Sequence, residues 1–323
     1  MMKGICAAFA FAALAASWQG PAQAAFPDQP IKLVVPFAPG ATIGPLAQLV
    51  SEQLSSDLGT PVYTEFKTGA GGNIGADIVA KSPGDGYTLL LGTISILTIN
   101  PSLYPDLPFD PVKDFKPVSM LVTTQNILVV NPESKIQSVA DLADYARQHP
   151  GQATFGSSGT GSTMHLAGEL FSTTAQVKMT HVPYRGGGPA RSDLLGGRLT
   201  LMFSDLSAVP MVQAGKLRAL AVTGSQRDGR IPDIPTMQES GMKGFDVEPW
   251  YGLVAPAGTP DAVIARLNAS VRKVFDKQQV RDALQNIGLR PASDLSVAYM
   301  AGKIDSDLGK WAPIVKSVDM KTN

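Results

Sequence analysis

Two stretches of the sequence share a design that can bind an anion. Ile31–Leu54 and Ala153–Phe171 each read as an apolar strand, a loop rich in glycine and hydroxyl groups, and an amphipathic helix. The first N–H groups of a helix have no partner inside it and carry the positive end of the helix dipole, so this junction suits a carboxylate. Because the junctions lie far apart in the chain, they predict a cleft that holds an anion from two sides.

The two loops differ in their supply of hydrogen-bond donors. The second loop is crowded with hydroxyl groups, those of Ser157, Ser158, Thr160, Ser162 and Thr163. In the first loop Thr42 is the only hydroxyl, and Pro39 and Gly40 shape the turn. Ordinary turn and capping chemistry is the alternative interpretation. We favour binding, because both loops join the end of a strand to the start of a helix.

Two further residues are candidates for the cleft. His165 falls in the first turn of the second helix, where it either contacts the ligand or holds the loop by packing and hydrogen bonding. Asp205 ends an apolar strand, and its carboxylate can accept bonds from a ligand, cap the next helix, or do both. Arg185, in a third loop after a strand, is expected to face solvent.

Catalytic and metal-binding signatures are missing from the sequence. It contains no GxSxG, GxxxxGK[ST], HExxH or CxxC motif. Gly69–Gly75 resembles a dinucleotide-binding loop but misses its third glycine by one place, so we interpret it as a tight turn or a cleft-lining loop. His149, His165 and His181 lack metal-ligand spacing. We therefore expect no cofactor and no metal.

An enzymatic alternative stays open at the second loop. A periplasmic hydrolase or isomerase could use Ser158 as nucleophile and His165 as base. The pair lacks an evident carboxylate to orient the histidine, which makes this interpretation the less favoured one. We predict a protein that is not an enzyme.

The N-terminal residues predict export to the periplasm. A charged start, the apolar run Gly4–Ser17 and the small-residue site Ala22–Ala24 indicate a signal peptide over residues 1–24, cleaved near Ala24. The only cysteine, Cys6, lies within it, which excludes disulfides and thiolate sites from the mature chain.

The charge balance excludes a nucleic-acid-binding surface, because the chain has 27 basic and 27 acidic residues and no long basic run. No other apolar run reaches membrane-spanning length, so the mature protein is not expected to be embedded in a membrane.

Strands and helices alternate along the mature chain, which predicts an α/β fold with parallel sheets. Eight apolar, β-branched runs are the predicted strands: Lys32–Phe37, Pro61–Phe66, Tyr87–Gly92, Ile127–Asn131, Ala153–Gly156, Met179–Pro183, Leu199–Ser204 and Ala219–Thr223. The chain should cross between two lobes within Met120–Val130 and return near Val247–Val254. This division predicts one discontinuous lobe, residues 25–126 and 249–323, and a second lobe, residues 127–248.

The chain resembles the periplasmic substrate-binding proteins of tripartite tricarboxylate transporters, the Bug or TctC-like family. Many blocks carry the resemblance, in the correct order along nearly the whole mature chain: Pro30–Pro39 (PIKLVVPFAP), Gly69–Gly75 (GAGGNIG), Asp85–Leu90 (DGYTLL), Asn100–Tyr104 (NPSLY), Leu107–Phe115 (LPFDPVKDF), Ser157–His165 (SSGTGSTMH), His181–Arg185 (HVPYR), Gly215–Thr223 (GKLRALAVT) and Trp250–Pro260 (WYGLVAPAGTP). It implies a type II periplasmic binding protein fold, with two doubly wound α/β lobes joined by hinge strands and a ligand cleft between them.

The resemblance also implies a function and a site. The ligand would be a small organic carboxylate, such as a di- or tricarboxylate, and the partner the membrane permease subunits of the transporter. The protein would act as a monomer, and a co-sensor that presents the acid to a receptor is the alternative. The family's carboxylate-holding loops match Phe37–Thr42 and Ser157–Gly161. The residues so implicated are Phe37, Pro39, Gly40, Ala41, Thr42, Ser157, Ser158, Thr160 and Gly161, with Thr93, Ser95 and Asp205 as further pocket residues.

The first loop departs from the family pattern. The family usually reads Pro-Gly-Gly-x-Thr-Asp with an arginine four residues later. Here the loop reads Pro39-Gly40-Ala41-Thr42-Ile43-Gly44, and Gln48 takes the arginine's place. Because an apolar residue and a glycine replace a polar pair, we expect a less polar pocket on this side and a ligand with one apolar portion.

Overall fold

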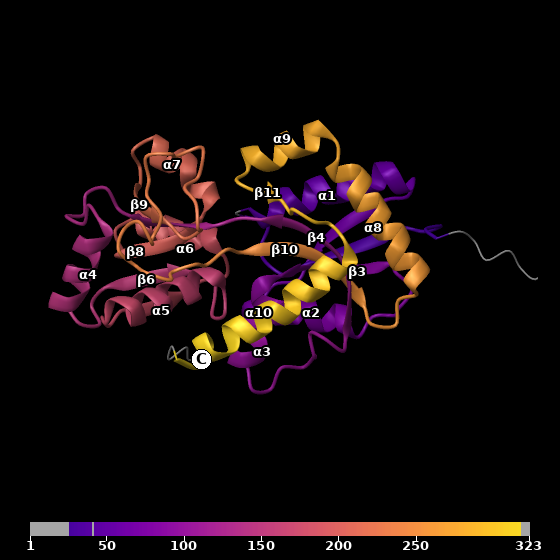
Figure 1. The fold of residues 1–323 in the computed structure, drawn as a ribbon, viewed down its shortest axis with the longest axis horizontal. Helices are drawn as coiled ribbons and strands as arrows, with labels where there is room; N and C mark the ends of the chain where they lie inside the picture. Colours follow the sequence, from indigo (N-terminus) through magenta and orange to yellow (C-terminus); the bar gives the residue numbers. More distant parts are fainter. Residues whose placement is uncertain (1–25, 41, 318–323) are drawn as a thin grey trace, which may run out of the picture.

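The computed structural model describes residues 26–40 and 42–317. The predicted signal peptide and Ala41 lie outside the described residues. Two β-sheets, each with helices packed against it, lie one after the other along the long axis of the molecule (Figure 1). The predicted α/β class is confirmed.

The first sheet, sheet A, has six strands in the order β11-β4-β10-β3-β1-β2. Their bounds are β1 Ile31–Val35, β2 Val62–Phe66, β3 Thr88–Thr93, β4 Phe115–Thr123, β10 Trp250–Pro256 and β11 Arg290–Pro291. The inner strands are almost fully buried, as expected for strands covered on both faces.

The second sheet, sheet B, has five strands in the order β7-β6-β8-β5-β9. Their bounds are β5 Asn126–Val130, β6 Thr154–Ser157, β7 Thr180–Pro183, β8 Leu201–Asp205 and β9 Arg218–Val222. The chain enters this sheet from β4 through residues 124 and 125, and it returns to sheet A at β10.

The expectation of parallel sheets is wrong in one respect, because both sheets are mixed. In sheet A, β10 runs antiparallel to β3 and β4. In sheet B, β5 runs antiparallel to β8 and β9. These are the strands by which the chain enters each sheet from the other one. An entering strand comes from the opposite side, so it runs against the strands built by local βαβ crossovers.

Helices cover both sheets. Around sheet A lie α1 Ile43–Leu58, η1 Ala70–Gly72, α2 Asn73–Ala80, η2 Ser95–Ile99, α3 Asn100–Leu103, α8 Asp261–Phe275, α9 Gln278–Asn286 and α10 Val297–Ser317. Around sheet B lie α4 Val139–Gln148, α5 Thr163–Ala175, α6 Gly187–Leu195, η3 Leu206–Ala208 and α7 Val209–Gln213. The helix α1 stops at Gly59 in a left-handed cap, and the Ser138 hydroxyl caps α4 by accepting from Asp141 N.

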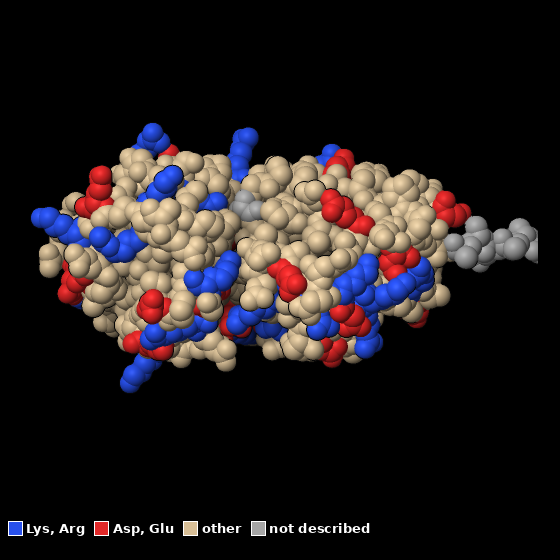
Figure 2. Space-filling model, turned by 90° about the horizontal axis from the view of Figure 1, so that it is seen from above, with Lys and Arg blue, Asp and Glu red and all other residues tan. Residues whose placement is uncertain are grey.

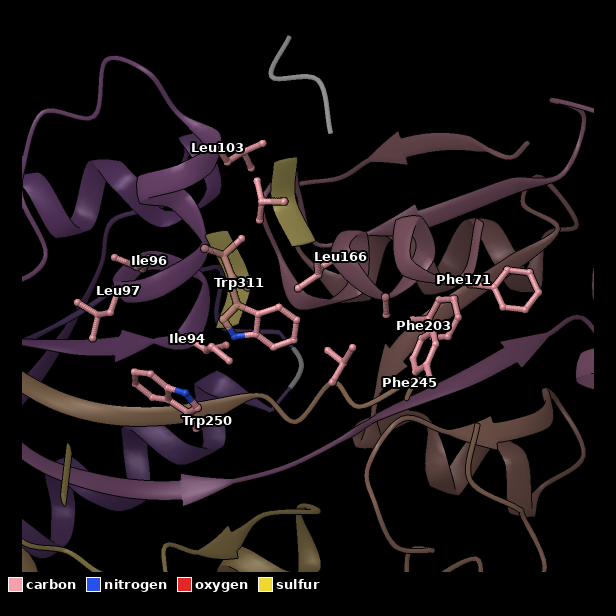
Figure 3. Close-up of a cluster of buried hydrophobic side chains, with 14 of the residues drawn as sticks. Ile94, Ile96, Leu97, Leu103, Leu166, Phe171, Phe203, Phe245, Trp250 and Trp311 are labelled. Carbon is pink, nitrogen blue, oxygen red and sulfur yellow. The ribbon is translucent and has the colours of Figure 1, made fainter. Parts of the chain in front are cut away.

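One buried apolar cluster extends through both sheets. It joins Val34 and Leu90 of sheet A to Phe155 and Phe203 of sheet B. Trp311 of α10 belongs to this cluster together with Ile94 and Leu166 (Figure 3). The two halves are thus in apolar contact beside the strands that connect them.

Charged side chains of both signs lie on the face seen from above, mostly along its lower edge and at its ends, with uncharged surface between them (Figure 2). Lys and Arg side chains alternate there with Asp and Glu, and no region of one sign covers it (Figure 2). Among the described residues, no helix is long and apolar enough to cross a membrane.

Candidate functional site

A small cavity of about 70 Å³ lies between the two sheets. It is lined at the starts of three helices, by Thr42 and Ile43 at α1, by Ser162 and Thr163 at α5, and by Gly186 and Gly187 at α6. The other lining residues come from strand ends and crossing segments: Phe37, Ala38, Gly40, Thr93, Ile94, Ser95, Thr124, Asn126, Ser158, Met164, Asp205, Pro249, Trp250 and Tyr251. Three helix N-termini therefore point their positive ends at one space.

Thr42 and Asp205 meet across this cavity. Thr42 precedes α1, but its hydroxyl makes no cap bond and instead donates to Asp205 Oδ1 at 3.0 Å. Oδ1 also accepts from Ser207 N at 2.9 Å, which caps η3 as predicted. Arg191 lies behind the carboxylate, with Nη1 3.8 Å from Oδ1 and donating to the hydroxyls of Ser204 and Ser207. One oxygen of Asp205 is thereby fixed.

Asp205 is the only charged side chain that faces the cavity among the described residues. The lining includes no Lys, Arg or His. Burial, aided by the negative charge of Asp205, raises the pKa of the neighbouring Tyr251 well above its usual value. A bound carboxylate must therefore be held by backbone N–H groups and hydroxyls rather than by an ion pair.

The second loop divides into residues that face the cavity and residues that shape the loop. Ser158 lines the cavity. The Ser157 hydroxyl is instead shared within its own half, with Gly159 N donating to it at 3.1 Å and His181 Nε2 lying 2.7 Å away. Gly161 N donates to His165 Nδ1 at 3.3 Å. Of the two roles considered for His165, the structure displays the loop-holding one.

Thr160 lies in a groove of about 510 Å³ that adjoins the cavity through Phe37 and Ser158. The groove is also lined by residues 68–72 and by Arg185, which is exposed to solvent as expected. Gly71 has φ +64°, and a Cβ there would lie 2.7 Å from Thr160 O, so the 69–75 segment forms a tight turn that lets the two halves approach. The hydroxyl of Tyr104 donates to Thr160 O at 3.2 Å.

Pro39 lies outside the lining of the cavity, and its carbonyl oxygen faces α1. A Cβ placed on Gly44 would lie 1.9 Å from that oxygen. The first loop thus passes so close to the helix that residue 44 can carry no side chain. The candidate residues that line the cavity itself are Phe37, Gly40, Thr42, Thr93, Ser95, Ser158 and Asp205.

His165 and His181 form a stacked pair beneath the second loop. Their ring centroids are 3.6 Å apart with the planes within 9° of parallel, and Phe155 packs against both. Burial, with a smaller effect from the charge of His165, lowers the pKa of His181 to about 3. The two histidine rings therefore support the second loop structurally.

The structure does not bring together Ser158 and His165, the nucleophile and base of the enzymatic alternative. His165 is 1% exposed, accepts from Gly161 N, and has its other ring nitrogen 3.5 Å from Glu169 Oε1. The serine that contacts a histidine is Ser157, whose hydroxyl is directed into its own half. Within residues 26–40 and 42–317, no group of three or more His, Cys, Asp or Glu side chains could hold a metal ion.

The sequence missed several residues of the cavity. The most informative is Asn126, the first residue of β5, which pairs with Asp205 of β8. The other missed residues are Ala38, Ile94, Thr124, Met164, Gly186, Gly187, Pro249, Trp250 and Tyr251. The crossings at 120–130 and 247–254 were predicted as connections, and only the pairing register reveals which of their side chains face the cavity.

Comparison with known proteins bears directly on this cavity. A family model described as "Tripartite tricarboxylate transporter family receptor" matches residues 46–320. The chain is similar to the structure of Rpa4515 from R. palustris with adipate, with 36% identity, a TM-score of 0.86, and coverage of 90% of this chain and 98% of that one. It is also similar to MatC from Rhodopseudomonas palustris with bound malate, with 32% identity, a TM-score of 0.85, and coverage of 90% and 100%.

A third similar structure is that of the periplasmic binding protein BugD. It is 30% identical, with a TM-score of 0.87 and coverage of 92% of this chain and 100% of that one. Together these similarities confirm the predicted resemblance and the two-lobed periplasmic binding fold.

Proposed function

Because the chain belongs to the tripartite tricarboxylate transporter receptor family, we propose that it captures a small organic carboxylate and delivers it to the permease of such a transporter. The observation that carries the proposal is the convergence of three helix N-termini on one cavity between two sheets. The adipate and malate bound by the two similar proteins support the same ligand class.

The carboxylate is held by uncharged donors. The hydroxyls of Ser158 and Ser162 and the first N–H groups of α5 face the cavity from one side, and those of α1 face it from the other. Ile43 and Ile94 add apolar surface on the sheet A side. The site therefore favours an acid with an apolar portion, which agrees with the altered first loop.

Capture involves closure of two lobes. The proposal takes residues 25–126 and 249–323 as one lobe and residues 127–248 as the other, and the strands of sheets A and B support this division except at Asn126, which begins β5 of sheet B. A cavity of about 70 Å³ is below the roughly 300–1,000 Å³ of typical ligand pockets, so the lobes must part to admit an acid. The hinge is formed by residues 124 and 125 and by the extended segment just before β10, where Thr124 N donates to Pro249 O.

The protein acts in the periplasm as a monomer, with the signal peptide removed near residue 24, and it releases the acid unchanged. Recovery of the bound acid is the direct test of the last point. Mass spectrometry after incubation with malate or adipate should return the acid intact, and a new product would identify an enzyme instead.

Substitutions at the cavity test the site. Ser158→Ala and Asp205→Ala should each weaken binding of malate about tenfold in calorimetry, because each removes a polar group of the cavity worth roughly 1–3 kcal/mol. Ser225→Ala and Asp233→Asn alter exposed residues away from the cavity and serve as controls. Wild-type affinity in both cavity variants would show that these residues only shape turns.

A further inference from the structure

Two residues that line the cavity each carry a buried polar atom with no partner in the described part of the chain. The two atoms are Nδ2 of Asn126, a donor, and Oδ2 of Asp205, an acceptor. The two residues are 2% and 5% exposed. Buried polar groups are nearly always paired, because an unpaired one loses its bonds to water and gains none. Both atoms therefore point to a ligand group.

The sheet holds the two side chains next to each other. Asn126 of β5 and Asp205 of β8 are direct partners in an antiparallel ladder. Directly opposed residues project from the same face of a sheet with Cβ atoms about 5 Å apart. A single small group in the cavity can therefore contact both.

The carboxylate cannot easily turn away from this arrangement. Its Oδ1 is occupied by Thr42 Oγ1 and Ser207 N, which fixes the direction of Oδ2. A Cβ placed on Gly187 would lie 3.0 Å from Oδ2, so the glycine at the start of α6 leaves room beside that oxygen.

We propose that the captured acid carries a hydroxyl group that donates to Asp205 Oδ2 and accepts from Asn126 Nδ2. This inference rests on the proposed function and narrows its ligand to hydroxycarboxylic acids. A hydroxyl both donates and accepts, so it satisfies both atoms at once. An ammonium group would leave the Asn126 amide unpaired, and a second carboxylate would lie against the Asp205 charge.

Matched pairs of acids that differ only in a hydroxyl provide the test. The pairs are malate and succinate, 2-hydroxyglutarate and glutarate, and citrate and propane-1,2,3-tricarboxylate, each titrated by calorimetry into the wild-type protein. In every pair that binds, the hydroxylated acid should bind at least tenfold more tightly, because a site built to bond a hydroxyl strongly rejects the analogue that lacks it.

Two variants assign that preference to the two side chains. Asn126→Ala removes the donor, and Asp205→Asn replaces the free acceptor. In both variants the ratio of the affinities for the hydroxylated acid and its partner should therefore fall to near one. Asp233→Asn makes the same chemical change at an exposed site and should keep the wild-type ratio. Circular dichroism and thermal unfolding establish that each variant is folded, and the wild-type titrations test the inference without any variant.

The outcomes separate the two proposals. Equal affinity for both members of every binding pair would overturn the hydroxyl inference and leave carboxylate capture intact. Tighter binding of aspartate than of malate would overturn it in favour of an ammonium group. Failure of every acid to bind would overturn capture itself together with the inference.

Discussion

The stacked rings of His165 and His181 fix the shape of the second loop from below. One ring accepts from Gly161 N, and the other contacts the Ser157 hydroxyl. His165 is buried and His181 is half-buried against Phe155, so the loop depends on His181 being neutral. Protonation of His181 would place a charge next to its partner ring in a site that offers it little water.

The low pKa of His181 should make stability fall in acid. In the unfolded chain the ring takes up a proton near pH 6.5, whereas in the folded protein it resists protonation down to about pH 3. Its contribution is thus fully present above about pH 6.5 and is lost as the pH falls toward about 3. Urea unfolding at about pH 7, 6 and 5 should give a steadily smaller free energy of unfolding.

His181→Gln should remove most of that pH dependence, since glutamine does not titrate and can still bond Ser157. The carboxyl groups of Asp57 and Glu65 have pKa values lowered by lysine partners, so they act mainly below their ordinary values of 3.8 and 4.5 and hence below the pH range of the three measurements. Equal slopes in wild type and His181→Gln would refute the assignment.

At the residue scale, the sequence predicted the polar groups of the loops better than their directions. Ser157 and Ser158 are neighbours of the same type, yet one bonds inward to His181 and the other lines the cavity. Side chains alternate along a strand, and the point where β6 ends decides which serine faces which way. Asn126 was missed for a related reason, because its role depends on its pairing with Asp205.

At the level of elements, the start of α1 explains the unusual first loop. Gly44 lies against the backbone of Pro39, and the helix follows immediately. Here the glycine brings Thr42 to Asp205.

Gly44→Ala should therefore displace the loop. The added methyl would meet Pro39 O at 1.9 Å, and the backbone must shift to relieve the contact. We expect at least tenfold weaker binding of malate and a loss of roughly 1–3 kcal/mol in the free energy of unfolding, measured by calorimetry and urea unfolding.

Gly302→Ala, on an exposed face of α10 with nothing within 4 Å, is the matched control. It should leave binding unchanged and add about 0.5–1 kcal/mol of stability, because alanine favours a helix more than glycine does. Normal binding by Gly44→Ala would mean that the loop tolerates the shift.

Elements with local connections were readable from the sequence. The eight predicted strands lie within one or two residues of observed ones, because each is an apolar run bounded by turns. The strands β4 and β11 were not predicted, β10 was expected only as a crossing near Val247–Val254, and the antiparallel direction of β5 was missed, since all of these depend on pairing between residues far apart in the chain. Apolar periodicity carries no information on such pairing.

For the whole molecule, contacts across the cleft indicate that the described conformation is closed. The hydroxyl of Thr42 donates to Asp205, that of Tyr104 donates to Thr160 O, and one apolar cluster runs through both halves. A ligand stabilises the closed conformation only if its contacts with the protein are more favourable there than in the open conformation.

Small-angle X-ray scattering should accordingly give a smaller radius of gyration with saturating malate than without it. Tyr104→Phe removes one closing bond and should weaken malate binding about two- to tenfold, since a hydrogen bond contributes roughly 0.5–1.5 kcal/mol. Tyr63→Phe, at an exposed tyrosine of β2, should bind as the wild type does. An unchanged radius of gyration with bound malate would contradict closure.

The place of β10 between β3 and β4 also sets the order in which the molecule can fold. Every strand of sheet B lies between residues 126 and 222, so that sheet can form while β10 is still unpaired. Until residues 250–256 insert, β3 and β4 each present an open edge of unpaired N–H and C=O groups. Sheet A therefore depends on a late, long-range pairing, which is slow to form and prone to aggregation. The protein is therefore most prone to aggregation during folding, before β10 pairs with β3 and β4.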